Sequence, residues 1–385
     1  MFDRSFAYLI YFCYNIAFQS EHLKGKIVQL FRKFFLVLVS LAIVLALYLL
    51  LWPVRIDPAA WYPPKAPPLT GVYAVNDGLA AVERIEIAGG NGPEDVAVDS
   101  LGRIYGGLQN GKIVRVQADG SGEEIFADTQ GRPLGLQFDR QGNLIVADGY
   151  KGLLSINPAG EITVLSTGVN GVPFGFTDDV DIAKNGVIYF SDASWKFSQE
   201  GYQMDALEHR PNGRLLAYDP ASKKTTVLLD SLYFANGIAV SPDQTFVLVN
   251  ETWEYRIRRY WLRGEKAGAS DIFIANLPGF PDGVSCNGKD TFWVALASPR
   301  QKIVDALADK PFLRKVVARL PKFVQPDALH YGFLLGLDVN GNVKFNLQSP
   351  SGKPFAVVTS VQQEGDVLFL GSLFEKAIGK LPVPH

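Results

Sequence analysis

Four residues of the sequence have the side chains needed to place oxygen ligands around one cation. Glu94, Asp178, Asn236 and Asp282 each open a short apolar run, and they occupy the same position of a recurring phrase. Carboxylate and amide oxygens are the ligands that calcium prefers, and calcium accepts an irregular oxygen shell. Three carboxylates that met without a cation would repel one another and favour protonation. The pattern therefore predicts a calcium site, provided that the fold brings the four positions together.

The alternative is that these residues only cap turns, which is the usual role of a single Asp or Asn between strands. Their shared position in the repeat favours the metal site. Zinc is excluded because the four histidines are scattered along the chain and no paired cysteines occur. The two cysteines, Cys13 and Cys286, lie on opposite sides of an apolar segment, so no disulfide is expected.

The recurring phrase consists of a turn, an alternating apolar strand, a glycine turn and a second strand. A third and a fourth strand follow most copies, as in GRLLAYDPASKKTTVLL. Six copies occur, beginning at Gly92, Arg132, Phe176, Phe234, Phe280 and Phe355. The rival folds are a solenoid and a sandwich, but the uneven spacing and the groups of four strands favour blades. The chain is therefore predicted to be an all-β, six-bladed β-propeller, in which the first strand of each unit lies at the axis.

The N-terminal part predicts a membrane anchor. Phe34–Trp52 is nineteen residues without a charge, which is close to the length that spans a bilayer core. Basic residues precede this run, so residues 1–33 are predicted to be cytoplasmic and the propeller extracytoplasmic. A cleaved signal peptide is the alternative, but the run is long and no small-residue cleavage site follows it. Whether the shorter apolar segment 6–18 contacts a membrane is left open.

The predicted domains are the cytoplasmic segment 1–33, a transmembrane helix 34–52, a Pro-rich linker 53–71 and the propeller 72–385. In the linker, WYPPKAPPL predicts a stiff, extended spacer. An insertion before the last blade, about residues 298–341, carries apolar residues at helical spacing with basic residues between them. It is expected to form either a lid over the mouth of the propeller or an amphipathic patch on the membrane.

Several phrases carry a resemblance to a known family, among them GPEDVAVD, FTDDVDI, IYFSDAS, FANGIAVSPD and LPGFPDGV. From about Val72 onward the chain resembles the strictosidine synthase-like group, in particular its adipocyte plasma membrane-associated type, within the gluconolactonase and paraoxonase superfamily. The resemblance implies a six-bladed propeller with a catalytic calcium. On this chain, the implied ligands are Glu94, Asp178, Asn236 and Asp282. Asp179 matches an acidic residue that usually follows the family's Asn.

Three positions depart from the relatives. Asp178 stands where they have Asn, which adds a negative charge to the implied shell. Leu134 stands where paraoxonase-like members have a histidine that is proposed as a base, so a histidine-assisted route is not supported. Strictosidine synthase uses a glutamate in its last blade, and Val357–Gln363 contains none. The alkaloid condensation is therefore not expected.

The sequence thus predicts calcium-dependent hydrolysis of a small-molecule ester or lactone. Asp282 or Asp179 is expected to orient or deprotonate a water molecule, or Asp282 to attack directly. The alternative is a non-catalytic, membrane-anchored scaffold in which calcium is structural. Charges nearly cancel, with 37 basic against 39 acidic residues, so no nucleic-acid partner is expected.

Overall fold

The computed structural model describes residues 4–384 and contains two compact units. One unit holds helix α1 (Arg4–Leu51) together with residues 316–324. The other holds residues 56–315 and 325–384, which form the propeller with its loops and short helices.

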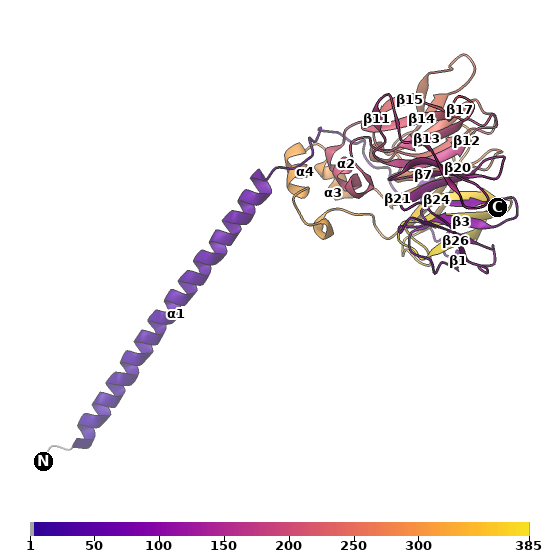
Figure 1. Ribbon diagram of the computed structural model, residues 1–385. Coiled ribbons are helices and arrows are strands. Elements are labelled where there is room, and N and C mark those ends of the chain that lie inside the picture. The colour runs from indigo at the N-terminus through magenta and orange to yellow at the C-terminus, as the bar shows by residue number, and fades with distance from the viewer. Residues whose placement is uncertain (1–3, 385) are drawn as a thin grey trace. The chain divides into compact units, whose positions relative to one another are not determined.

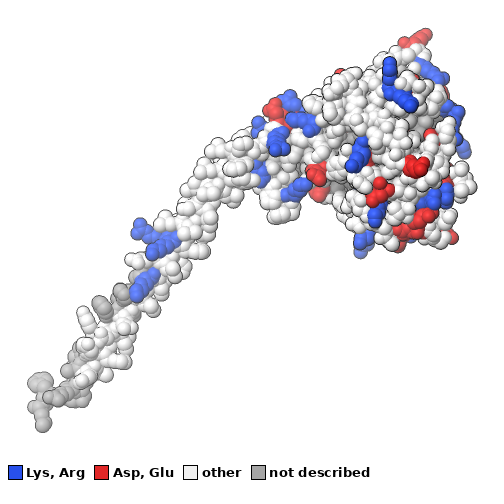
Figure 2. Space-filling view, viewed as in Figure 1, with Lys and Arg blue, Asp and Glu red and all other residues white. Residues whose placement is uncertain are grey.

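Helix α1 contains the predicted anchor. Its stretch Lys26–Leu51 is long and apolar enough to cross a membrane, and its apolar side chains are exposed (Figure 2). The basic cluster that precedes the apolar run lies on the same helix. The segment 6–18 is not a separate element, because it continues into this helix without a break. Pro53 follows the last turn and prevents the helix from continuing.

The second unit is a six-bladed β-propeller, which confirms the predicted fold (Figure 1). Each blade is a four-stranded antiparallel sheet, and in the first five blades the strands follow in chain order from the axis outward. The first three blades are β2–β5 (Val96–Val98, Ile104–Gly107, Lys112–Val116, Glu124–Asp128), β6–β9 (Pro133–Phe138, Leu144–Asp148, Gly152–Ile156, Ile162–Ser166) and β12–β15 (Thr177–Ile182, Ile188–Asp192, Gly213–Asp219, Lys224–Leu232). The next two are β16–β19 (Ala235–Val240, Phe246–Glu251, Arg256–Trp261, Ser270–Ile274) and β20–β23 (Gly279–Cys286, Phe292–Pro299, Gly332–Leu337, Val343–Ser349).

The sixth blade closes the ring. It consists of β24 (Val358–Glu364), β25 (Val367–Ser372), β26 (Ala377–Pro382) and β1 (Glu83–Glu86), so the first strand of the propeller completes its last sheet. Strand β1 pairs antiparallel with β26 over four residues, from Glu83 opposite Lys380 to Glu86 opposite Ala377. This pairing protects the outer edge of β26 and joins the two ends of the ring.

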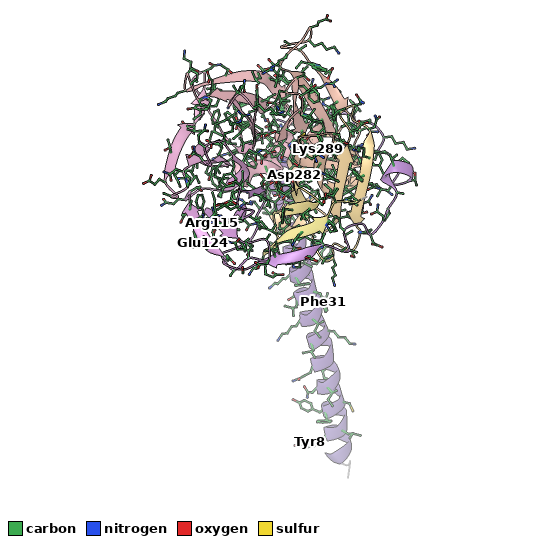
Figure 3. All side chains as sticks on the ribbon, turned by 90° about the vertical axis from the view of Figure 1, so that its right-hand side faces the viewer. Tyr8, Phe31, Arg115, Glu124, Asp282 and Lys289 are labelled. Atoms are coloured by element: carbon green, nitrogen blue, oxygen red, sulfur yellow. The ribbon has the colours of Figure 1, made fainter. Side chains whose placement is uncertain are left out.

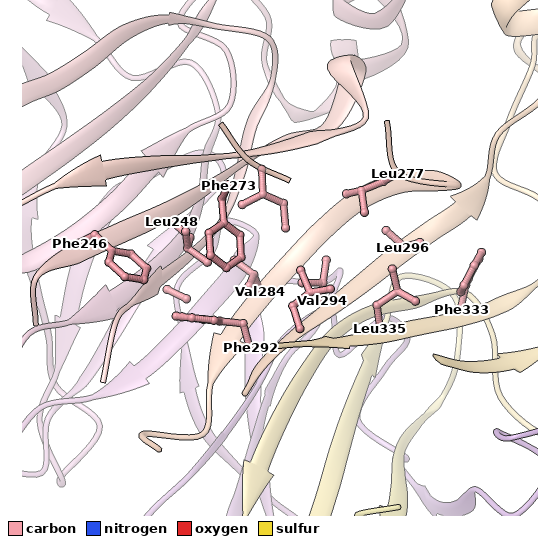
Figure 4. Packing of buried hydrophobic residues seen from close by; sticks show 13 residues of the cluster. Phe246, Leu248, Phe273, Leu277, Val284, Phe292, Val294, Leu296, Phe333 and Leu335 are labelled. Atoms are coloured by element: carbon pink, nitrogen blue, oxygen red, sulfur yellow. The ribbon is translucent and has the colours of Figure 1, made fainter. Parts of the chain in front are cut away.

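Packing between blades forms the hydrophobic core. One cluster lies between the fourth and fifth blades and joins Phe246 and Leu248 to Phe292, Val294 and Leu335 (Figure 4). The alternation of apolar residues in the repeat places one face of each sheet against the next blade. Similar clusters fill the other gaps, so every blade is buried on both faces.

Short elements between the strands cover one end of the propeller. They are the hairpin β10–β11 (Gly168–Val169, Val172–Pro173), the helices α2 (Tyr202–Glu208), α3 (Lys302–Leu307) and α4 (Pro311–Val317), and the 3-10 turns Gly71–Tyr73, Gln199–Gly201 and Thr252–Glu254. A further 3-10 turn, Lys322–Val324, belongs to the first unit. The predicted insertion precedes the last blade, as expected, but it lies inside the fifth blade, between β21 and β22. It is also shorter than 298–341, because the apolar run Gly332–Leu337 is the third strand of that blade.

Candidate functional site

The four predicted ligands lie where the inner strands begin. Asp178, Asn236 and Asp282 each stand in a register shift at the start of β12, β16 and β20, and Glu94 lies two residues before β2. Such β-bulges leave residues unpaired and turn their side chains away from the ladder. Viewed onto the ring, Asp282 lies near the centre, whereas the Arg115–Glu124 ion pair lies at the rim (Figure 3). Three bulges and the turn before β2 therefore place one polar side chain from each of four blades in the same pocket.

All four side chains line one pocket, and each is at most 7% exposed. The Asn236 amide Nδ2 donates a hydrogen bond to Asp282 Oδ1 at 2.6 Å. Asp178 Oδ2 is buried and has no hydrogen-bond partner. The structure thus brings together residues that lie far apart along the chain.

Burial and mutual repulsion disfavour the charged forms of these acids. Burial raises the pKa of Glu94 well above its usual range, and the charges of Asp282 and Asp178 raise it further. The pKa of Asp178 is raised in the same way, by burial and by Asp282. Burial raises the pKa of Asp282 to about 7, although the hydrogen bond from Asn236 lowers it. Without a cation, the ionised forms of these three carboxyl groups are therefore disfavoured.

Arg132 is the nearby positive charge, and sequence reasoning missed it. It is 2% exposed and lowers the pKa of both Glu94 and Asp178. Its Nη1 donates to the carbonyl oxygens of Gly92 and Gly107, which fixes the guanidinium between the first two blades. Arg132 also faces Asp148, so it offsets at most one of the three negative charges of the site.

The donor set fits a hard divalent cation in its chemistry. All available ligand atoms are oxygens, one of them is an orphaned buried carboxylate oxygen, and the charge left after Arg132 matches a divalent ion. Within residues 4–384, however, no three Asp, Glu, His or Cys side chains are spaced as a ready metal site. Asn236 instead bonds to Asp282. A coordination shell would therefore require these side chains to turn from their present hydrogen bonds.

The residue after each pocket residue faces the neighbouring blade. At Gly237 and Gly283 this contact is so close that a Cβ would lie 2.4 Å from Asp282 O and 2.6 Å from Thr359 O, respectively. Where the residue is Asp, its carboxylate accepts a backbone N–H of the next blade instead. Asp95 Oδ2 binds Leu136 N at 2.8 Å, and Asp179 Oδ2 binds Ile238 N at 2.7 Å.

The same contact between blades explains where the carboxylate of Asp179, the second predicted catalytic residue, lies. The structure does not bring Asp179 to the pocket of Glu94 and Asp282. Its carboxylate lies on the other side of the bulge, in a small polar space of the central channel that Asp95 and Asp181 also line. Asp179 is therefore placed as a brace between the third and fourth blades.

Two side chains of the fourth blade hold the backbone that carries Asp282. Asn250 Nδ2 donates to Asp282 O, and Thr252 Oγ1 donates to Pro281 O at 2.7 Å. Both side chains are buried. They fix the bulge of β20 from the neighbouring blade, so the direction of the Asp282 side chain depends on that contact.

The rest of the pocket is largely apolar and aromatic. It encloses about 370 Å³ and is walled by Leu134, Phe176, Phe234, Trp253, Phe280 and Leu373, among others. Helix α2 contributes Tyr202 and Leu207, and helix α3 contributes Val304 and Leu307. Both helices lie at the end of the propeller where the inner strands begin, and α3 belongs to the predicted insertion, for which a lid was one of the two expected roles. The acidic cluster therefore lies at the bottom of an apolar chamber that these elements partly cover.

The Pro-rich segment is extended but is not a free spacer. Asp57 N donates to Glu208 Oε2 at 3.0 Å, and Arg300 Nη2 donates to Pro64 O at 2.8 Å. Ile56 and Pro58 are buried. The segment thus binds along the propeller and places Trp61 in the wall of the chamber.

Trp61 covers a buried histidine, His209, for which the sequence predicted no role. The indole stacks on His209 with 4.2 Å between ring centroids. His209 Nε2 lies 3.2 Å from Glu254 Oε1, and burial lowers the pKa of this histidine. His209 lines the same chamber as the acidic cluster. Its position after α2, at a left-handed backbone conformation, gave no signal in the sequence.

Comparisons with known proteins agree with this architecture. Residues 71–116 match the family model described as "Strictosidine synthase-like, N-terminal", and residues 178–265 match that described as "Strictosidine synthase". Strictosidine synthase-like 6 of Arabidopsis thaliana is 37% identical over 310 residues, which is 79% of this chain and 82% of the relative. The adipocyte plasma membrane-associated protein of Rattus norvegicus is 35% identical over 370 residues, which is 90% of this chain and 98% of the relative.

Solved structures show the same fold at low sequence identity. A gluconolactonase of Xanthomonas campestris superposes with a TM-score of 0.59 at 15% identity, covering 86% of this chain and 99% of its own. Regucalcin of Agrobacterium tumefaciens, described as a calcium-binding protein, superposes with a TM-score of 0.55 at 15% identity, covering 79% and 94%. Taken with the relatives above, the chain belongs to the strictosidine synthase-like family, which includes the adipocyte plasma membrane-associated proteins.

Proposed function

We propose that this protein is a calcium-dependent hydrolase of apolar esters or lactones, anchored to a membrane by helix α1. The observation that carries the proposal is the position of three buried carboxylates at the bottom of a partly covered apolar chamber. Acidic groups that disfavour their own ionisation add little to the stability of a fold, and such groups in a cavity are typical of functional sites. A site of this kind suits a neutral substrate with a polarisable carbonyl.

Glu94, Asp178, Asn236 and Asp282 are the residues that would hold calcium. When bound, the ion supplies a Lewis acid that polarises a carbonyl oxygen and stabilises the negative charge formed during attack. Asp282 is the residue proposed to accept a proton from the attacking water, or to attack directly. Its side chain is oriented by the Asn236 amide, and its backbone is held by Asn250. Asp179 is not part of this catalytic set, because its carboxylate accepts a hydrogen bond from Ile238 N and lies outside the chamber.

The apolar walls define the substrate class. Phe176, Phe234, Trp253 and Phe280 surround the space next to the acids, and Trp61 and helix α3 cover it. These side chains would bind the hydrocarbon part of an ester or lactone and exclude bulk water from the carbonyl. A strongly hydrophilic or highly charged substrate would lose its hydration there without enough polar partners.

The anchor sets the proposed location. The basic residues before the apolar run of α1 favour a cytoplasmic N-terminus, with the propeller on the extracytoplasmic side. The rat relative is named a plasma membrane-associated protein, in agreement with an anchored chain. We propose that the protein works beside the bilayer as a single-pass membrane protein.

A non-catalytic scaffold with a structural calcium is the second candidate. The observation that favours it is that the four pocket residues come from four different blades. In that case the cation would tie blades together and the chamber would bind a ligand without turnover. The two functions differ in whether bound substrate is hydrolysed.

The test uses the full chain in detergent or nanodiscs, with phenyl acetate, simple lactones and esters of longer acyl chains. We expect turnover that a calcium chelator abolishes and added calcium restores. Glu94→Gln should lose this activity. Asp95→Asn is the matched control, because the adjacent Asp95 faces the channel and bonds to Leu136 N, so its variant should keep most of the activity.

Turnover that persists in chelator would reject the metal role. Calcium-dependent stabilisation without turnover of any of these substrates would favour the scaffold. Equal loss of activity in Glu94→Gln and Asp95→Asn, with both variants folded, would show that the pocket position of Glu94 has no special part in the reaction.

A further inference from the structure

We propose that residues Val316–Val324 form a second membrane-contacting element, which lies in the lipid headgroup region beside the end of helix α1. The occupant of its exposed surface is the bilayer itself. This inference rests on the anchor that belongs to the proposed function, but not on calcium or on catalysis.

The first observation is a set of hydrogen bonds within the first unit. Arg319 Nε donates to Trp52 O at 2.6 Å, and Arg319 Nη1 donates to Leu49 O at 2.8 Å. The Tyr48 hydroxyl donates to Arg319 O at 3.2 Å. The last carbonyls of a helix have no partner within the helix, and a positive charge there also interacts favourably with the helix dipole. Arg319 therefore holds the segment against the end of the membrane helix.

The second observation is the depth that these bonds impose. The uncharged run Phe34–Trp52 rises about 28 Å as a helix, at about 1.5 Å per residue. A bilayer hydrocarbon core is about 30 Å thick, so Trp52 O lies near the boundary between acyl chains and headgroups. Arg319 is hydrogen-bonded to that oxygen and cannot lie far from the same boundary. A guanidinium at this depth is within reach of lipid phosphates.

The third observation is the composition of the exposed surface. Phe323 is 90% exposed, and Val324, Pro321 and Lys322 are exposed beside it. A large aromatic side chain next to a lysine is the pairing that membrane interfaces favour, since the ring enters the acyl boundary and the ammonium group stays among the headgroups. One exposed Phe on a soluble surface would need no explanation. Its place beside the helix end is what assigns it to the bilayer.

The element also has a place in the function. It is flanked in the chain by Arg314 on one side and by Gln325 and Pro326 on the other, and these flanking residues line the apolar chamber. Membrane contact at Phe323 would thus be joined by a few residues of chain to the chamber wall. An apolar substrate dissolved in lipid suits such a connection.

The test places a fluorescent probe at Phe323 in the full chain reconstituted into liposomes of phosphatidylcholine and phosphatidylserine. Cys13→Ser and Cys286→Ser remove the native thiols, and Phe323→Cys is labelled with a nitrobenzoxadiazole dye. Leu41→Cys in α1 is the membrane control. Leu101→Cys is the aqueous control, because Leu101 lies in a turn of the first blade and is 74% exposed.

We expect the label at 323 to shift to shorter wavelength in liposomes and to lose most of its emission to nitroxides attached to lipid headgroups. The label at 41 should be quenched by nitroxides deep in the acyl chains, and the label at 101 by neither. A label at 323 that behaves like that at 101 would overturn the proposal while leaving the anchor intact. Shielding of 323 from aqueous iodide without quenching by lipid nitroxides would also overturn it, in favour of a protein partner. An unquenched label at 41 would reject the anchor, and this proposal with it.

Discussion

Asp178→Asn should raise stability without calcium and reduce the stabilisation that calcium provides. Asp178 Oδ2 is buried without a hydrogen-bond donor, and the neighbouring charge of Asp282 disfavours the ionised form. An amide at this position removes one of the repelling charges, and its NH2 can donate to the remaining carboxylates. The effect of calcium should be the reverse, because the variant loses a charged ligand.

The expected changes in stability follow from the unpaired Asp178 oxygen and from the coupling of calcium binding to folding. A buried polar group without a partner costs about 1–3 kcal/mol, so the free energy of unfolding in chelator should rise by about that amount. For a large domain, 1 kcal/mol corresponds to roughly 2 °C in Tm, so the midpoint should rise by about 2–6 °C. Calcium at a hundredfold excess over its Kd stabilises the wild type by about 2.7 kcal/mol. A tenfold weaker site would lose about 1.4 kcal/mol of that gain.

The assay is thermal unfolding of the full chain followed by tryptophan fluorescence, in chelator and across a calcium titration. Asp148→Asn is the matched control. The Asp148 carboxylate accepts hydrogen bonds from Thr129 Oγ1 and from the backbone N–H groups of Arg132, Tyr150 and Lys151. In Asp148→Asn the side-chain NH2 group would face one of these N–H or O–H donors and could not accept its hydrogen bond. This variant should therefore lose the same stability with and without calcium.

The reasoning is wrong if, in chelator, Asp178→Asn lowers the free energy of unfolding as much as Asp148→Asn does. In that case, repulsion between the carboxylates at the axis does not destabilise the protein without calcium. If the wild-type midpoint does not move with calcium, the site does not bind the ion at the concentrations used.

Three further outcomes are expected. Asp179→Ala should lower the free energy of unfolding by about 1–3 kcal/mol, because it leaves Ile238 N without its acceptor, while the calcium affinity measured by titration stays near the wild-type value. Burial lowers the pKa of His209 from 6.5, so the unfolded state binds a proton first as the pH falls, and wild-type stability should decline below about pH 6.5. His209→Gln should show a smaller decline in unfolding experiments across that range, and an identical decline would contradict this origin. Trp61→Ala should weaken binding of an apolar fluorescent ligand severalfold, because the chamber loses part of its cover, whereas unchanged binding would place the ligand elsewhere.

The repeat in the sequence was sufficient to predict the ring. Its strand pairs recur in each blade, and the four oxygen-bearing residues hold the same position near the start of the inner strand, so Glu94, Asp178, Asn236 and Asp282 were correctly brought together. Binary patterning carries this information because each blade needs the same alternation to bury its two faces. The calcium itself and the hydrolysis remain predictions.

Other features could not be read from local patterns. Asp179 follows Asp178 directly, and only the bulge in β12 sends the two carboxylates to different places. The cover of the chamber comes from segments far apart in the chain, including the Pro-rich segment, whose composition alone indicates an extended spacer. Arg132 begins the second copy of the repeat, and nothing in the sequence indicates its role, because that role depends on carbonyl groups of the first blade.

Closure of the ring and assembly of the site depend on one another. Thr359 Oγ1 donates to Glu94 O at 2.7 Å, and Gly371 lies so close to the same carbonyl that a Cβ there would meet it at 2.1 Å. Both residues belong to the sixth blade, which exists as a four-stranded sheet only because β1 pairs with β26. Glu94 is therefore positioned by a blade that the chain completes from its two ends. Carboxylates that repel one another stay close together only if the surrounding structure is rigid, and the closed ring of blades provides this rigidity. Cation binding should for this reason be coupled to unfolding of the whole propeller rather than to the opening of one loop.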